Sequence, residues 1–179
     1  MRASNVIVGV SGSIAVYKGV EIVRALSKKG FNVLVVMTSC AQRFVSPLTF
    51  QSVSGNSVFT DMFREDKQPL HISLAQKADI VLVAPATANI IGKVANGICD
   101  DLLSTLLIST KAKILVAPAM NQNMYENPVV QENIEKLKAR GYEFIPPIYG
   151  DLVCAERGKG HLAEVEEIVR RVEERAREG

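Results

Sequence analysis

The sequence predicts an α/β protein of one domain over residues 1–179, with a three-layer, doubly wound parallel sheet of the Rossmann or flavodoxin-like type. Short apolar runs are separated by segments with helical periodicity, which is the order of a doubly wound fold. Within each run the apolar residues are consecutive, as in parallel strands buried on both faces. With 179 residues and 47% hydrophobic content, the chain can form one full core and has little room for a second domain.

The strands are predicted where β-branched and other apolar residues form these short runs and turn residues interrupt them. In chain order the predicted strands are Asn5–Val10, Phe31–Met37, Ile80–Ala84, Ile114–Ala117 and Tyr142–Ile145.

The helices are predicted between the strands. In Ala15–Lys29 the apolar residues recur at helical spacing, and Gly30 stands just past the end, where glycine commonly terminates a helix. Pro128–Arg140 likewise ends ahead of Gly141. The other predicted helices are Ala41–Val45, Ser73–Lys77, Thr87–Asn96, Asp101–Ser109 and the charged amphipathic segment Ala163–Glu178.

One long segment, Pro146–Gly160, has neither strand nor helix periodicity. It holds three glycines and two prolines around Cys154, which predicts a loop. Loops of this length in a compact domain often act as lids, and we expect this one to close over a substrate.

Composition and charge exclude several classes of protein. The net charge of +2 and the scattered lysines and arginines argue against a nucleic-acid partner. Cys40, Cys99 and Cys154 lack the paired spacing of a disulfide framework or a zinc site, which favours a reducing cytoplasm. Val6–Val10 is too short for a signal peptide, and no later apolar run approaches 18 residues. We therefore expect a soluble, cytoplasmic protein without a membrane partner.

The turn after the first strand, Gly9–Ile14, is a candidate phosphate site because it opens a helix, where backbone amides and the helix dipole attract anions. A dinucleotide site would also need an acidic residue after the second strand. The residues there are Thr38-Ser39-Cys40, which favour a mononucleotide such as FMN. No Walker A sequence is present. Alternatively, Gly12 only permits a tight turn.

Two further strand ends carry candidate ligand-binding residues. Pro85–Asn89 brings small residues that let a flat ring approach the backbone, although Thr87 is also a typical helix cap. In Pro118–Tyr125, Asn121 supplies a hydrogen-bond donor and an acceptor, and Met120 and Met124 supply adaptable apolar contacts. Ligands of open α/β sheets bind beyond the carboxyl ends of the strands, so these ends predict a small-molecule site.

The histidines and the acid pair are each open to a catalytic or a structural interpretation. His71 opens a short helix, and its imidazole is suited to proton transfer, but a lone histidine is also commonly structural. His161 has less to favour it, and two separated histidines without a third ligand argue against a metal site. The pair Asp100-Asp101 is interpreted as the N-terminal cap of the following helix.

The cysteines are likewise open to a reactive or a structural interpretation. Arg157 and Lys159 lie near enough in sequence to lower the pKa of the Cys154 thiol, although Cys154 also fits a small buried apolar residue. Cys40 and Cys99 fit the buried role better, because each adjoins a predicted helix.

Taken together, these segments resemble the flavin-dependent cysteine decarboxylases, from Asn5 to about Ala163. The combination is specific, although single members are not. The segments that carry the resemblance are Gly12-Ser13-Ile14, Pro47–Gly55, His71–Leu74, Ala84–Asn89, Gly97–Leu103, Pro118–Tyr125 and the loop around Cys154.

The resemblance implies FMN as the cofactor and assigns roles to individual residues. The implied FMN-binding residues are Gly12, Ser13, Ile14, Ser39, Thr87, Ala88, Asn89 and Ala119. The implied substrate-binding residues are Asn121 and Met124, and the implied catalytic residues are His71 and Cys154, with no metal. Tyr125 stands where many relatives have tryptophan, which keeps a flat ring at that position.

The resemblance also implies the reaction, a decarboxylation of 4′-phospho-N-pantothenoylcysteine to 4′-phosphopantetheine in coenzyme A biosynthesis. The implied assembly is a homotrimer, or a dodecamer of trimers, with the flavin near a subunit interface. The ligase that precedes this step is expected on a separate chain or on sequence outside these residues. Alternatives with the same fold are a flavin prenyltransferase, a peptidyl-cysteine decarboxylase and a non-enzymatic flavin-binding regulatory subunit.

Overall fold

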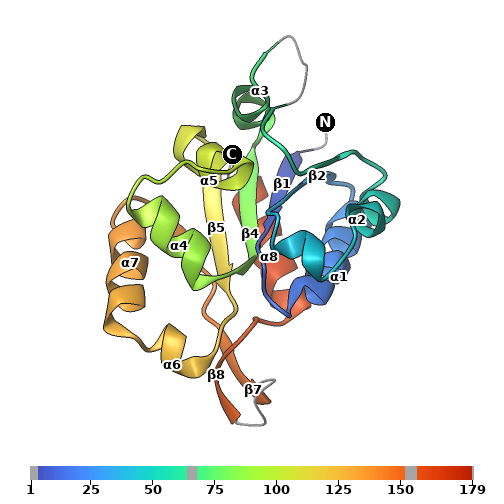
Figure 1. Cartoon of the computed structure of the whole chain (residues 1–179). Coiled ribbons are helices and arrows are strands. Elements are labelled where there is room, and N and C mark those ends of the chain that lie inside the picture. Colours follow the sequence, from blue (N-terminus) through green and yellow to red (C-terminus); the bar gives the residue numbers. More distant parts are fainter. Residues whose placement is uncertain (1–3, 64–67, 152–156, 179) are drawn as a thin grey trace.

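The computed structural model describes residues 4–63, 68–151 and 157–178, and a six-stranded parallel sheet lies at its centre (Figure 1). The strand order is β3-β2-β1-β4-β5-β6, so the order reverses between β1 and β4. The predicted doubly wound parallel sheet is confirmed. Its strands are β1 (Asn5–Val10), β2 (Asn32–Met37), β3 (Val58–Phe59), β4 (Ile80–Ala86), β5 (Lys113–Pro118) and β6 (Glu143–Phe144).

Helices cover both faces of this sheet (Figure 1). One core contains α1 (Val16–Lys28), α2 (Pro47–Ser54) and α8 (Val165–Arg177). The other contains α3, α4, α5 and α7, which span Leu70–Lys77, Ala88–Ala95, Leu102–Ser109 and Pro128–Lys138. Every residue of β1 and β4 is buried. Successive residues of a strand point to opposite faces, so each strand serves both cores, which explains the consecutive apolar runs.

Local sequence signals account for most helix ends. Gly30 and Gly141 both have positive φ and follow α1 and α7, as their positions predict. The expected helix Ala41–Val45 is wrong in extent, because only a 3₁₀ turn forms at Ala41–Arg43. Helix α2 was not predicted, although its Ser46 cap and Pro47 are typical start signals. The short strand β3 and the one-turn helix α6 (Gln122–Tyr125) were also missed.

The prediction that Pro146–Gly160 is a loop is wrong in the part that the structure describes. Strand β7 (Ile148–Asp151) pairs antiparallel with β8 (Arg157–His161), and residues 152–156 lie outside the described residues. A Cβ atom on Gly160 would collide with the Met120 carbonyl oxygen, and one on Gly158 with the Gln122 side chain. The glycines allow the hairpin to lie against α6. Because this contact stabilises the hairpin, its strands lack the apolar run from which strands are predicted.

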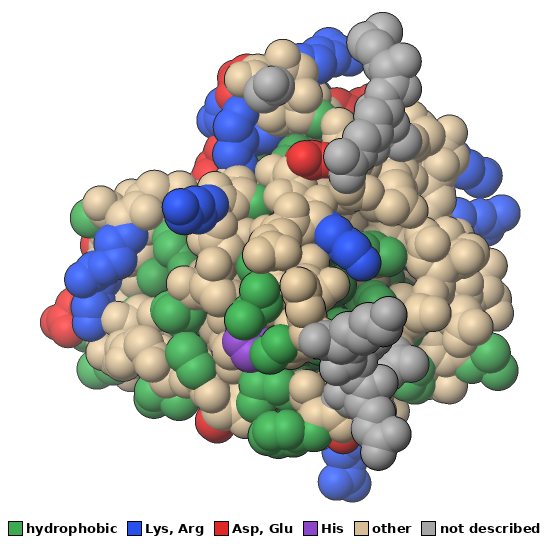
Figure 2. Space-filling view, turned by 90° about the horizontal axis from the view of Figure 1, so that it is seen from above, with side chains coloured by type: hydrophobic (Ala, Val, Ile, Leu, Met, Phe, Trp, Pro, Cys, Tyr) green, Lys and Arg blue, Asp and Glu red, His purple; other side chains and the backbone are tan. Residues whose placement is uncertain are grey.

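The surface differs from expectation at two cysteines. Cys40 and Cys99 are exposed, not buried, because each lies in a connection before a helix. On the face seen in Figure 2, lysine and arginine side chains lie at several separated places, often near acidic ones. None of the helices within the described ranges has the length and apolar character needed to cross a bilayer.

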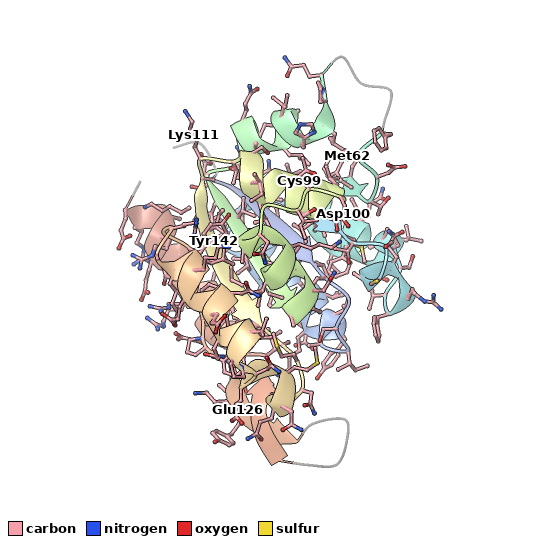
Figure 3. All side chains as sticks on the ribbon, turned by 60° about the vertical axis from the view of Figure 1, so that its left-hand side comes forward. Met62, Cys99, Asp100, Lys111, Glu126 and Tyr142 are labelled. Atoms are coloured by element: carbon pink, nitrogen blue, oxygen red, sulfur yellow. The ribbon has the colours of Figure 1, made fainter. Side chains whose placement is uncertain are left out.

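Asp101 of the acid pair caps helix α5, as predicted, whereas Asp100 does not. Asp101 accepts a hydrogen bond from the Ser104 amide at 2.8 Å, and the Ser104 hydroxyl accepts one from the Asp101 amide at 3.2 Å. Lys93 Nζ lies 2.7 Å from Asp100 and 3.1 Å from Asp101, and its hydrogen bond lowers the pKa of Asp100. Figure 3 shows Asp100 and Cys99 in the connection between α4 and α5.

We expect Asp101→Ala to lower the free energy of unfolding by about 1 kcal/mol, because the substitution removes this cap. The control is Asp100→Ala, which removes the more exposed partner of Lys93 and leaves the cap intact. Urea denaturation of both variants should show the larger loss for Asp101→Ala. Equal losses would contradict the capping role.

Candidate active site

A cavity of about 600 Å³ lies beyond the carboxyl ends of β1, β4 and β5. It lies beside the point where the strand order reverses, which is the usual ligand site of open α/β sheets. In Figure 1 these strand ends point toward α6 and the β7–β8 hairpin. The lining residues are Gly12, Ser13, Ile14, Ala15, Tyr17, Thr87, Ala119, Met120, Asn121, Met124, Gly160, His161 and Leu162.

The β1 side of the cavity has the properties of a phosphate site. Gly12 and Ser13 line it just ahead of α1, whose N-terminus has no side-chain cap and no acidic residue in its first turn. Such a helix end favours an anion. A Cβ atom on Gly12 would lie 2.5 Å from the Cys40 Cβ, so the glycine is required for the approach of the turn to Cys40.

The β4 side is formed by Thr87, which has both of the roles considered for it. Its hydroxyl caps α4 by accepting a hydrogen bond from the Ile90 amide at 3.4 Å, and the residue also lines the cavity. Ala88 and Asn89 follow in the first turn of α4 and are not among the lining residues. Ser39 is exposed and is also outside the lining.

The β5 side presents the predicted substrate-binding residues. Ala119 is buried, and its amide donates to the Ala86 carbonyl at 3.0 Å, which ties the β5 end to the β4 end. Asn121 caps α6 by accepting a hydrogen bond from the Asn123 amide at 2.8 Å. That bond fixes the direction of the Asn121 side chain. Met124, in α6, is 48% exposed at the cavity.

The structure does not bring His71 to this cavity within one chain. His71 lies in the first turn of α3, at the end of the molecule opposite α6 (Figure 1). Its side chain is half-buried, and its Nδ1 atom has no hydrogen-bond partner among the described residues. Figure 2, which views the α3 end, shows hydrophobic side chains gathered on this face of the molecule. Cys154 lies outside the described residues.

Sequence reasoning assigned five of the cavity residues no role in the site: Ala15, Tyr17, Gly160, His161 and Leu162. Tyr17 lies in the first turn of α1 and is 51% exposed. His161 ends β8, and a Cβ atom on Gly150 would lie 3.0 Å from its Cγ atom, so Gly150 leaves room for the ring. Gly158 and Gly160 alternate with larger residues in this strand, and glycine at such positions marks the close approach of another segment.

The lining fits a flat apolar ring with an anionic tail. Ile14, Met120 and Leu162 supply apolar walls, and the uncapped end of α1 supplies an anion site. The cavity volume is within the range of small-molecule sites. These residues therefore fit FMN. Over the described ranges, no cluster of three or more metal-ligating side chains is present.

The model of the family described as "Flavoprotein" matches residues 1–177 of the chain. The chain is 51% identical over 171 residues to the coenzyme A biosynthesis bifunctional protein CoaBC of Bacillus subtilis, covering 94% of this chain but 42% of that protein. It is 40% identical to a probable phosphopantothenoylcysteine decarboxylase of Streptococcus mutans, covering 94% of this chain and 97% of that protein.

Solved structures agree with these relationships. A PPC decarboxylase mutant complexed with pantothenoylaminoethenethiol is 30% identical, with a TM-score of 0.86 over 96% of this chain and 97% of that chain. The FMN binding protein AtHal3 is 29% identical, with a TM-score of 0.86 over 99% of both chains. From these matches, which extend over nearly its whole length, the chain belongs to the flavoprotein family.

Proposed function

We propose that the chain is an FMN-dependent enzyme that decarboxylates 4′-phospho-N-pantothenoylcysteine to 4′-phosphopantetheine in coenzyme A biosynthesis. The observation that carries the proposal is that the Gly12–Ile14 turn and the Asn121–Met124 segment line the same cavity. The turn suits FMN, and the Asn121–Met124 segment suits the substrate. The relationship to the probable phosphopantothenoylcysteine decarboxylase over 97% of that protein supports it.

The chemistry that FMN supplies when bound is the removal of two electrons from the cysteinyl end, giving a thioaldehyde that allows carbon dioxide to leave, and their later return to the enethiol. Gly12, Ser13 and the end of α1 would hold its phosphate, and Ile14, Thr87 and Ala119 would lie nearer the ring. The implied roles of Ser39, Ala88 and Asn89 stay predictions.

The remaining roles belong to the chain's own side chains. The Asn121 side chain binds the substrate carboxylate or the neighbouring amide, since it lines the cavity and carries an amide group. Met124 contacts the apolar part of the substrate. His71 accepts the proton released during oxidation. Cys154 donates a proton when the enethiol is reduced to the product thiol.

The assembly in this proposal is a homotrimer, or a dodecamer of trimers, in which a neighbouring copy supplies His71. A proton acceptor must lie about 3 Å from the heavy atom that carries the proton. Strand β4 has seven residues and spans about 20 Å between the α3 end and the cavity end. The exposure of Ile14 and Tyr17 at the cavity, 55% and 51%, supports contact with another copy.

The proposal places this activity in the cytoplasm and in one domain over residues 1–179. The chain covers 42% of the length of the first CoaBC relative, which is named bifunctional. We assign the joining of cysteine to phosphopantothenate to sequence outside these residues.

We expect the purified protein to show flavin absorption bands and to release carbon dioxide from 4′-phospho-N-pantothenoylcysteine. His71→Asn should keep the flavin bands and lose about a hundredfold or more in turnover, because it removes the proton acceptor. Mass spectrometry of the product measures turnover by the unsubstituted protein and by the His71→Asn variant. Normal turnover in a yellow His71→Asn variant would exclude this role. Prenylated flavin, or turnover of a cysteine-ended peptide alone, would favour one of the alternatives.

Replacement of Cys154 by serine should separate the two halves of the reaction. Carbon dioxide release should continue, because the thiol is needed only for the later proton transfer, and the enethiol should accumulate in place of 4′-phosphopantetheine. Single-turnover mass spectrometry distinguishes the two products by two hydrogens. Complete formation of 4′-phosphopantetheine would remove Cys154 from the mechanism.

Mixed oligomers test whether His71 acts across an interface. His71→Asn and Asn121→Ala copies, co-expressed with different tags, should each be inactive alone. Oligomers that hold both copies should regain activity, because some interfaces then pair an intact His71 with an intact Asn121. The matched control is a mixed-tag oligomer of His71→Asn alone. Mixed oligomers as inactive as this control would contradict the arrangement.

A further inference from the structure

The ends of β1 and β4 are joined by one buried hydroxyl group. Ser11 is 2% exposed, and its Oγ donates to the Pro85 carbonyl at 2.8 Å and accepts from the Thr87 amide at 2.9 Å. The Ser11 amide also donates to the Pro85 carbonyl, at 3.2 Å. Ser11, which directly follows β1, therefore makes three hydrogen bonds to the end of β4.

These bonds begin where the regular sheet pairing stops. Strands β1 and β4 are in register from Val6 opposite Ile80 to Gly9 opposite Val83. On the other side of β4, the pairing with β5 is shifted between Val83 and Ala86. Beyond Val83, the backbone bond between the ends of β1 and β4 is the one from the Ser11 amide to the Pro85 carbonyl. The Ser11 hydroxyl adds two bonds where the regular ladder has stopped.

The residues on either side of this connection line the cavity. Gly12 and Ser13 directly follow Ser11, and Thr87 is the residue whose amide Ser11 binds. The same junction continues through backbone groups, from the Ala119 amide to the Ala86 carbonyl and from the Met120 amide to the Gly160 carbonyl, both at 3.0 Å. The other bonds named here join backbone groups, whereas Ser11 acts through its side chain. The contribution of Ser11 can therefore be tested by substitution.

We infer that Ser11 is a positioning residue for the flavin site: its hydroxyl sets the separation between the phosphate-binding turn and Thr87. The inference rests on the proposed function, because it takes FMN as the ligand. Loss of the hydroxyl leaves the part-buried Thr87 amide without this partner, and a backbone donor that is shielded from water and has no partner is disfavoured. The Thr87 segment then moves or admits water, and the two sides of the cavity no longer match one ligand.

The test compares Ser11→Ala with Ser104→Ala. Ser104 is also a buried serine that bonds to backbone, but it caps α5 and is not among the cavity residues. Fluorescence titration with FMN should show a dissociation constant raised about tenfold for Ser11→Ala and unchanged for Ser104→Ala. Ser11→Thr keeps the hydroxyl and should restore most of the affinity.

Two further measurements separate positioning from general stability. Hydrogen exchange without FMN should be faster at the Thr87 amide in Ser11→Ala than in Ser104→Ala. At saturating FMN, kcat should fall in Ser11→Ala with little change in KM for the substrate, because Ser11 acts on the flavin side.

Each contrary result has a distinct meaning. FMN affinity unchanged in Ser11→Ala, equally weakened in Ser104→Ala, or not restored in Ser11→Thr would overturn the inference and leave the proposed function standing. Failure of the unsubstituted protein to bind FMN would instead overturn the proposed function.

Discussion

The hydrogen-bonded junction across the ends of β1, β4 and β5 is the constraint on which the rest of the site depends. Because β1 and β4 are buried on both faces, ligand-binding groups can be placed only where the strands end. At that edge, Ser11 connects β1 to β4, and the Ala119 amide connects β5 to β4. A rigid framework therefore holds the turn, the Thr87 segment and the Asn121 segment around one volume, and elements on rigid strands position ligands more exactly than free loops.

This framework suits binding more fully than proton transfer. The cavity has an anion-favouring helix end, apolar walls and an oriented amide, which together select and hold ligands. The histidine that the family resemblance makes catalytic lies at the other end of the sheet. In our proposal this separation makes catalysis depend on assembly, because one copy holds the substrate and another moves the proton. Such a division also keeps an isolated chain from starting a reaction in an open, hydrated site.

Elements with local causes could be predicted from the sequence, and those that depend on distant contacts could not. The β1 and β4 strands follow from their apolar runs, and the Asp101 cap follows from residues three positions apart. The β7–β8 hairpin does not, because Gly158 and Gly160 are explained only by the α6 segment that they contact. The cavity residues Gly12, Thr87 and Asn121 follow known strand-end chemistry, whereas His161 enters the lining only through that hairpin. The exposure of Cys40 and Cys99 likewise depends on how the connections pack.

The glycine contacts of β8 also bear on how substrate range can diverge in this family. The base of the hairpin is held against the main body by the bond between the Met120 amide and the Gly160 carbonyl, and by the close approach of Gly158 to Gln122. The bond joins two backbone groups, and the close approach needs a glycine, so a neighbouring position such as His161 can change while the anchor stays the same. Because His161 lines the cavity, a different side chain there would alter the ligand contacts without moving the hairpin.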